Sequence, residues 1–75
     1  METRDMVRMA NQIGSFFKSY GAEEGRKEIA THINNFWEPR MRRHLFAYVA
    51  AGGKELAPEI MAAMDLVRKP ADEAA

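Results

Sequence analysis

A proline in the middle of the chain, Pro39, constrains the fold more than any other residue. Proline lacks a backbone N–H and fixes φ, so it ends a helix that reaches it, and it restricts the residue before it to extended conformations. It is favoured, however, as the first residue of a new helix. We therefore expect one helix to end near Trp37 and another to begin at Pro39. Glu38 would be the N-cap, with its carboxylate accepting hydrogen bonds from free backbone N–H groups.

An aromatic and a cationic residue flank this break. Trp37 precedes the expected N-cap and Arg42 lies about one turn inside the next helix, two positions that often touch across a helix start. We expect the Arg42 guanidinium to lie over the Trp37 ring, a cation–π contact worth about 0.5–2 kcal/mol. This contact would fix the corner between the two helices.

Apolar residues recur at helical spacing on both sides of the break, so the fold class is predicted to be all-α. The pattern predicts helices over residues 3–20, 22–36 and 39–51, the first capped by Thr3, and a short fourth helix from Pro58. We expect a small three-helix bundle with this short C-terminal helix, residues 1–68 forming a single domain and residues 69–75 a disordered tail. The expected core faces contain Met6, Met9, Ala10, Ile13, Phe16, Phe17, Tyr20, Ile29, Ile33, Phe36, Met41, Leu45, Tyr48, Val49, Ile60, Met64 and Val67.

Two glycines and an asparagine carry further expectations. Gly14 lies inside the first helix at the edge of its apolar face, where a glycine costs about 1 kcal/mol relative to alanine. This indicates the close approach of another helix. Gly21 is well placed to end the first helix in a left-handed conformation. Asn34 is expected to face water near the end of the second helix.

Composition excludes several classes of function. The chain has 75 residues, no cysteine and a formal net charge of zero. A domain of this size buries a modest core, which makes a stabilising partner plausible on physical grounds. The zero net charge argues against a free-standing nucleic-acid binder. No apolar run approaches the ~20 residues that span a bilayer, and no signal-peptide pattern follows the N-terminus. We expect a cytoplasmic protein that does not contact a membrane.

No catalytic constellation stands out. The two histidines belong to different predicted helices, without a carboxylate at zinc-helix spacing, and Gly52-Gly53 lacks the residues of a phosphate-binding loop. A chain this short has little room for both a core and a ligand pocket. An enzyme is therefore not expected. His32 allows two readings: a ligand or pH switch, or a partly buried imidazole with a hydrogen bond inside the fold.

Two groups of residues are candidate binding surfaces. The first is the basic cluster of Arg40, Arg42, Arg43 and His44. It fits a protein contact, because arginine and tryptophan are enriched at the energetic centres of interfaces; a solvated helix face and a nucleic-acid surface are the alternatives. The second is apolar: Met61 and Leu66 fall off the core face of the last helix, and methionine is common on adaptable binding surfaces.

Two segments of the chain resemble a known family. Residues 9–17, MANQIGSFF, and residues 29–43, IATHINNFWEPRMRR, are similar to the delta subunit of soluble NAD-linked formate dehydrogenases. The resemblance extends over about residues 7–68. It implies an accessory subunit that binds no cofactor itself and supports assembly or stability of the holoenzyme. The complex would carry a molybdenum or tungsten pterin, iron–sulfur clusters, FMN and NAD.

The resemblance also implies where the partner binds. The large catalytic subunit is the expected partner, and the matching motifs give the candidate contact residues. Together with the two apolar residues of the last helix, these candidates are Asn11, Gln12, His32, Trp37, Glu38, Pro39, Arg40, Arg42, Arg43, Met61 and Leu66. The alternative for Trp37, Glu38 and Pro39 is that they mainly shape the corner between the second and third helices. Two other functions remain open: a small helical regulator that binds nucleic acid through the Arg40–His44 face, and an assembly factor that leaves the mature enzyme.

Overall fold

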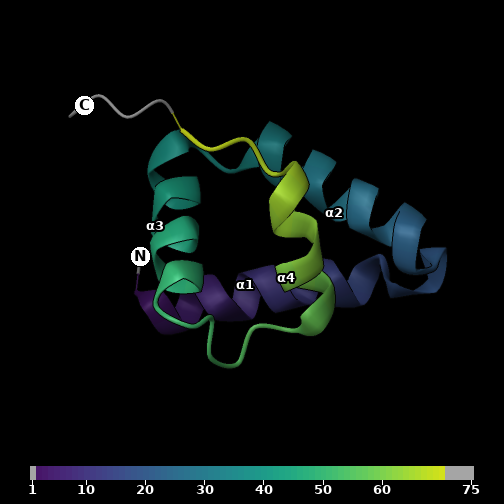
Figure 1. The fold of residues 1–75 in the computed structure, drawn as a ribbon, viewed down its shortest axis with the longest axis horizontal. Coiled ribbons are helices and arrows are strands. Elements are labelled where there is room, and N and C mark those ends of the chain that lie inside the picture. The colour runs from purple at the N-terminus through teal and green to yellow at the C-terminus, as the bar shows by residue number, and fades with distance from the viewer. Residues whose placement is uncertain (1, 71–75) are drawn as a thin grey trace.

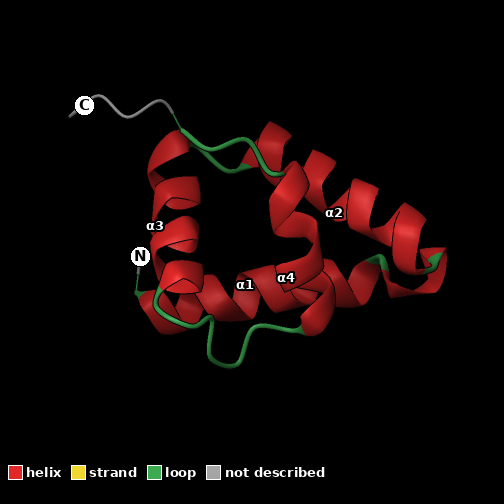
Figure 2. Ribbon diagram, in the orientation of Figure 1, coloured by secondary structure: helices red, strands yellow, loops and turns green. Residues whose placement is uncertain are grey.

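The protein is all-α, as predicted, in a computed structural model that describes residues 2–70. The helices are α1 (Thr3–Phe16), α2 (Ala22–Phe36), α3 (Pro39–Ala50) and α4 (Pro58–Ala63), with short 3₁₀ helices at η1 (Lys18–Tyr20) and η2 (Met64–Leu66). Figure 1 shows α1 and α2 as a hairpin, α3 across the N-terminal end of α1, and α4 between the two helices of the hairpin. Figure 2 shows helices joined by loops, without a strand, over the part of the chain that is described. Residues 71–75 of the expected tail lie outside it.

The break at Pro39 is confirmed, but its capping differs from the prediction. Glu38 is the N-cap of α3 with extended φ and ψ of −68° and 163°, yet its side chain makes no capping hydrogen bond. The N-cap of α1 is Glu2 rather than Thr3. Instead, Thr3 Oγ1 lies 3.0 Å from His44 Nε2, which ties the start of α1 to α3.

The end of the first helix is also tighter than expected. The α-helix stops at Phe16, and residues Lys18–Tyr20 continue as a 3₁₀ turn, a common way to satisfy the last carbonyl groups of a helix. Gly21 follows with φ of +90°, a value that side chains disfavour. The predicted positive φ at Gly21 is therefore confirmed, and the turn starts α2 directly afterwards.

The helix α4 packs across the α1–α2 hairpin and closes the core. A Cβ atom at Gly14 would lie 3.1 Å from both Glu59 Cγ and Ile60 Cδ1, so the expected close approach of another helix is confirmed and the neighbour is α4. The buried core combines all four helices with the loop before α4 and the residue after η2; its members are Met6, Val7, Ala10, Ile29, Ala30, Ile33, Trp37, Leu45, Leu56, Ile60, Ala63, Met64 and Val67.

Two asparagines fasten the two ends of the α4 segment. Asn11 on α1 donates to the Glu55 carbonyl oxygen at 2.9 Å and accepts from the Ala57 N–H at 2.8 Å. Asn34 on α2 donates to the Leu66 carbonyl oxygen at 3.1 Å and accepts from the Arg68 N–H at 2.7 Å. We name this pair the asparagine clamps. The expectation that Asn34 faces water is wrong. Its side-chain amide bonds to the Leu66 carbonyl and the Arg68 N–H at the end of η2, backbone groups that have no partner within a helix.

Three aromatic residues assigned to the core faces are exposed instead. Phe16 and Phe36 are each 72% exposed and Tyr20 is 50% exposed. The core-face prediction is wrong for these three, because Val7, Trp37 and Leu56 fill the core and no described element covers the aromatic side of the hairpin. Periodicity shows which residues share a face, but it does not show whether another element covers that face.

Candidate functional site

The described residues do not assemble a metal centre or a transmembrane helix. Within residues 2–70, no group of three or more histidine, cysteine, aspartate or glutamate side chains is placed to hold a metal ion. None of the described helices is long and apolar enough to cross a membrane. The features that remain are surface grooves, which we describe in turn.

The corner at Pro39 is held by hydrogen bonds from the Arg42 side chain to backbone carbonyls rather than by a stacked ring. Trp37 is only 4% exposed. Arg42 Nε donates to the Trp37 carbonyl oxygen at 3.1 Å, and Arg42 Nη1 donates to the Arg68 carbonyl oxygen. The cation–π contact found in residues 2–70 is a different one, with Lys69 Nζ 5.9 Å from the Phe46 ring centroid. The predicted stacking of Arg42 on Trp37 is therefore replaced by a fork that joins the α2–α3 corner to the chain after η2.

Replacing Arg42 by alanine is expected to destabilise the fold by about 1–3 kcal/mol, because two backbone carbonyl groups lose a charged donor. For a domain of this size the melting temperature should fall by several degrees. Thermal unfolding followed by circular dichroism measures this shift. Arg42→Lys is the control: it keeps the charge but cannot reach both carbonyls with one planar group, so it should recover part of the loss. A melting temperature equal to that of the wild type would contradict the structural role of Arg42.

The outer face of α3 forms a basic groove of about 550 Å³, lined by Glu38, Arg40, Met41, Arg43, His44 and Ala47. Arg40 and Arg43 are exposed, and His44 is half-buried at its contact with Thr3. The zero net charge of the chain conceals an uneven distribution. The neighbouring helices α1 and α3 contain five arginines against Asp5, and with their N-caps Glu2 and Glu38 included they carry a net charge of +2. This end of the molecule favours an acidic partner surface.

A second groove, of about 340 Å³, lies between α1 and α2. We name it the hairpin groove; its lining residues are Met9, Gln12, Ile13, Phe16, Phe17, His32 and Trp37. Aromatic rings surround it. Ring centroids of Phe17 lie 4.9 Å from Phe16 and 5.3 Å from Tyr20, and that of His32 lies 4.8 Å from Phe36. Exposed aromatic groups next to a groove are typical of binding surfaces.

His32 belongs to this aromatic surface. Its ring is half-buried and lies 6.3 Å from the Phe17 ring, between Phe17 and Phe36. The described part of the chain places it in no metal-binding group. The imidazole therefore acts as a polar member of an aromatic cluster, a reading that the sequence did not suggest.

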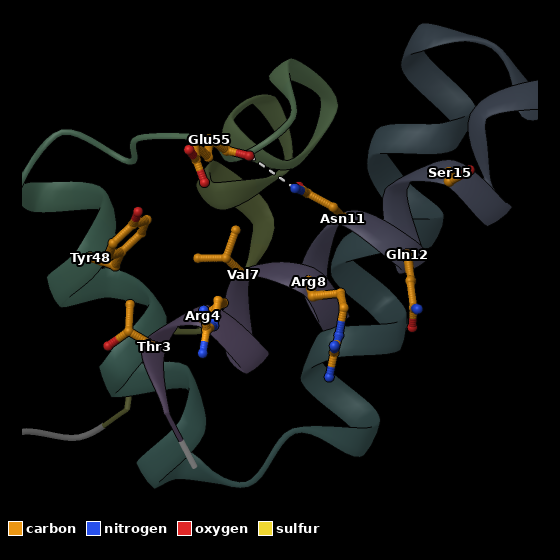
Figure 3. A pocket seen from close by; sticks show the side chains of 9 residues that line it. All are labelled: Thr3, Arg4, Val7, Arg8, Asn11, Gln12, Ser15, Tyr48 and Glu55. Carbon is orange, nitrogen blue, oxygen red and sulfur yellow. Dashed lines mark hydrogen bonds between the residues drawn. The ribbon is translucent and has the colours of Figure 1, made fainter.

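A third groove, of about 570 Å³, runs along the N-terminal part of α1 beside α3. Figure 3 shows its lining, which consists of Thr3, Arg4, Val7, Arg8, Asn11, Gln12, Ser15, Tyr48 and Glu55. Two of its polar residues have partners inside the chain: Asn11 forms the first asparagine clamp, and Arg8 is 3.1 Å from Asp5. Ser15 has no histidine beside it in this lining, so the groove does not present an activated nucleophile.

The structure separates the predicted contact residues into two groups. Asn11, Trp37 and Arg42 hold the fold together, as described above. The other predicted contact residues are the half-buried His32 and seven exposed residues: Gln12, Glu38, Pro39, Arg40, Arg43, Met61 and Leu66. Sequence reasoning missed Phe16, Tyr20 and Phe36 as surface residues. The available signal was chain length, because a domain of 75 residues leaves a large share of its surface exposed.

The described residues form a small helical protein with surface grooves and with exposed aromatic and arginine residues, features that are typical of binding surfaces. Comparison with known families shows to which family the chain belongs. Residues 5–64 match the family model of the NADH-dependent formate dehydrogenase delta subunit FdsD, and the chain belongs to this family. No significant match was found among curated proteins or among solved structures.

Proposed function

We propose that this chain is a non-catalytic accessory subunit that binds the large molybdenum- or tungsten-containing subunit of a cytoplasmic NAD-dependent formate dehydrogenase and supports its assembly or stability. The observation that carries the proposal is the family match over residues 5–64. The grooves and exposed side chains described above support it physically, because they offer binding surface.

The cofactors of such a complex would belong to its other subunits. Iron–sulfur clusters are held mainly by cysteine thiolates, and this sequence contains no cysteine. The residues of this chain therefore do not fit a cluster. We assign the pterin, the clusters, FMN and NAD to the partners, and we derive no catalytic step from the delta subunit itself.

The basic groove is the first contact that we propose. Arg40 and Arg43 would pair with carboxylate or carbonyl groups of the large subunit, since guanidinium groups bind such acceptors with defined geometry. Both side chains are exposed, so changing them should leave the core intact.

Replacing both Arg40 and Arg43 by glutamate is expected to weaken binding of the large subunit at least about tenfold, because like charges then meet across the interface. The measurement is co-purification with a tagged large subunit, followed by formate-dependent reduction of NAD. Lys54→Glu is the matched control, since it reverses an exposed charge in the loop before α4. Far-ultraviolet circular dichroism of the isolated variants should stay at the wild-type signal. Undiminished co-purification of the double variant would exclude the basic groove as the contact.

Two alternatives give different results in the same experiment. A nucleic-acid regulator would bind DNA or RNA with strong salt dependence and would not retain the large subunit. A transient assembly factor would bind an immature large subunit but be missing from the purified, active complex. A fixed stoichiometry in the active complex supports the permanent subunit.

A further inference from the structure

The hairpin groove lies on a side of the α1–α2 hairpin that no described element covers. Gly14 faces α4, where a Cβ atom would touch Glu59 and Ile60. At about 100° per residue, Gln12 and Phe16 project roughly 160° away from Gly14 around α1. One side of the hairpin therefore packs on α4, and the opposite side presents the hairpin groove with its aromatic residues.

The exposed aromatic area is large for a chain of this size. Complete burial of an aromatic side chain removes about 150–250 Å² from water. Phe16 and Phe36 are each 72% exposed and Tyr20 is 50% exposed, so together they present roughly 290–490 Å². The largest apolar patches on monomeric proteins reach about 300–600 Å² and are often functional. The aromatic surface is thus in the range of a binding site.

The hairpin groove and the basic groove have lining residues that are neighbours in the sequence at the Pro39 corner. Trp37 lines the hairpin groove, and the next residue, Glu38, lines the basic groove. Successive Cα atoms lie about 3.8 Å apart, so a bound segment that crosses the Pro39 corner contacts both grooves. A stable interface needs about 800 Å² from each partner, which is more than the aromatic area alone. The additional area comes from the arginine-lined surface of α3.

We propose, on the basis of the function proposed above, that the hairpin groove binds an apolar segment of the large subunit that is flanked by acidic side chains. The apolar side chains pack between Phe16 and Phe36, and the acidic side chains pair with Arg40 and Arg43 beyond the corner. Charge decides against a second copy of this chain as the occupant. A copy that used the same two grooves would bring its own Arg40 and Arg43 to the interface, where Glu38 is the one acidic residue in the lining of these grooves, so like charges would meet.

The test compares two pairs of exposed apolar residues. Phe16→Ser with Phe36→Ser alters the hairpin groove at Phe16 and the exposed Phe36 ring beside its lining residue His32. Met61→Ser with Leu66→Ser alters the exposed apolar residues of α4 and η2, which are 38% and 40% exposed. The dissociation constant of each full-length variant for the purified large subunit is measured at low and high salt. We expect about thirtyfold or greater weakening for the phenylalanine pair, the range of interface hot spots, and less than about threefold for the control pair. Wild-type binding should weaken with salt because of the acidic flank.

A second variant guards against loss of folding. Gln12 is exposed at the rim of the hairpin groove, so Gln12→Trp should fill the groove without removing a core contact. It should weaken binding while the melting temperature stays near that of the wild type. Analytical ultracentrifugation of the wild-type chain alone tests whether a second copy of the chain binds to it.

The outcomes separate this inference from the proposed function. If the wild-type chain does not bind the large subunit, the proposed function is overturned and this inference with it. If the wild type binds and both the phenylalanine pair and Gln12→Trp bind equally well, the inference is overturned while the proposed function stands. A wild-type dimer that the phenylalanine pair dissociates would identify a second copy as the occupant and would also overturn the inference.

Discussion

Replacing Ile60 by alanine is expected to cost about 2–5 kcal/mol of folding free energy, the largest effect of any single substitution considered for this protein. Ile60 is fully buried, and its Cδ1 atom lies against Gly14 where α4 crosses α1. Removing the side chain leaves a cavity at the contact between these two helices. Small domains have total stabilities near the low end of about 5–15 kcal/mol, so the melting temperature should fall by at least about 10 °C.

Thermal and urea unfolding of the isolated chain measure this loss. Leu66→Ala is the matched control, since it removes an aliphatic side chain of similar size from a position that is 40% exposed. It should shift the unfolding free energy by less than about 1 kcal/mol. Equal effects of the two substitutions would contradict the packing of α4 into the core.

Replacing both Asn11 and Asn34 by alanine is also expected to lower the free energy of unfolding strongly. Each substitution removes two side chain–backbone hydrogen bonds, which contribute about 0.5–1.5 kcal/mol each and so about 1–3 kcal/mol together. The clamps hold opposite ends of the α4 segment and share no partner. Their costs should therefore add to about 2–6 kcal/mol in the double variant. The Asn11 clamp also holds Glu55, whose φ of +71° is disfavoured for a residue with a side chain.

Urea unfolding of the single and double variants tests whether the clamps act independently. In the double variant, amide hydrogen exchange should accelerate more in α4 and η2 than in α3, because the clamps fasten the α4 segment to the hairpin. Asn35→Ala is the control, since Asn35 is the exposed neighbour of Asn34 on the same helix. A double variant no less stable than Asn35→Ala would show that the four hydrogen bonds contribute nothing net to stability.

Local chemistry determined the order and most of the bounds of the helices. Proline rules placed the α2–α3 break and the start of α4, and both are confirmed. Glycine rules placed the turn at Gly21 and the close helix approach at Gly14. These features depend on a few neighbouring residues, so the sequence contains the necessary information. The family resemblance over residues 7–68 is likewise confirmed by the family match over residues 5–64.

The roles of individual side chains at the candidate site depended on distant partners. Arg42 was expected on the Trp37 ring but donates to backbone carbonyls, one of them on Arg68. Asn34 was expected in water but is 32 positions in sequence from its Leu66 partner. Such pairs form because a helix end elsewhere in the chain lacks hydrogen-bond partners. Sequence spacing within one helix does not reveal them.

The sequence by itself determined that the chain is all-α, where its helices break, and that no cysteine is present to bind a metal. Only the tertiary structure decided which apolar face is covered. Phe16 and Ile13 follow the same helical period as Ala10, yet Ala10 is buried against the core while Phe16 remains 72% exposed. The physical reason is that burial depends on where α4 crosses the hairpin. That position is fixed by long-range contacts, namely the packing of Ile60 against Gly14 and the hydrogen bonds of the asparagine clamps.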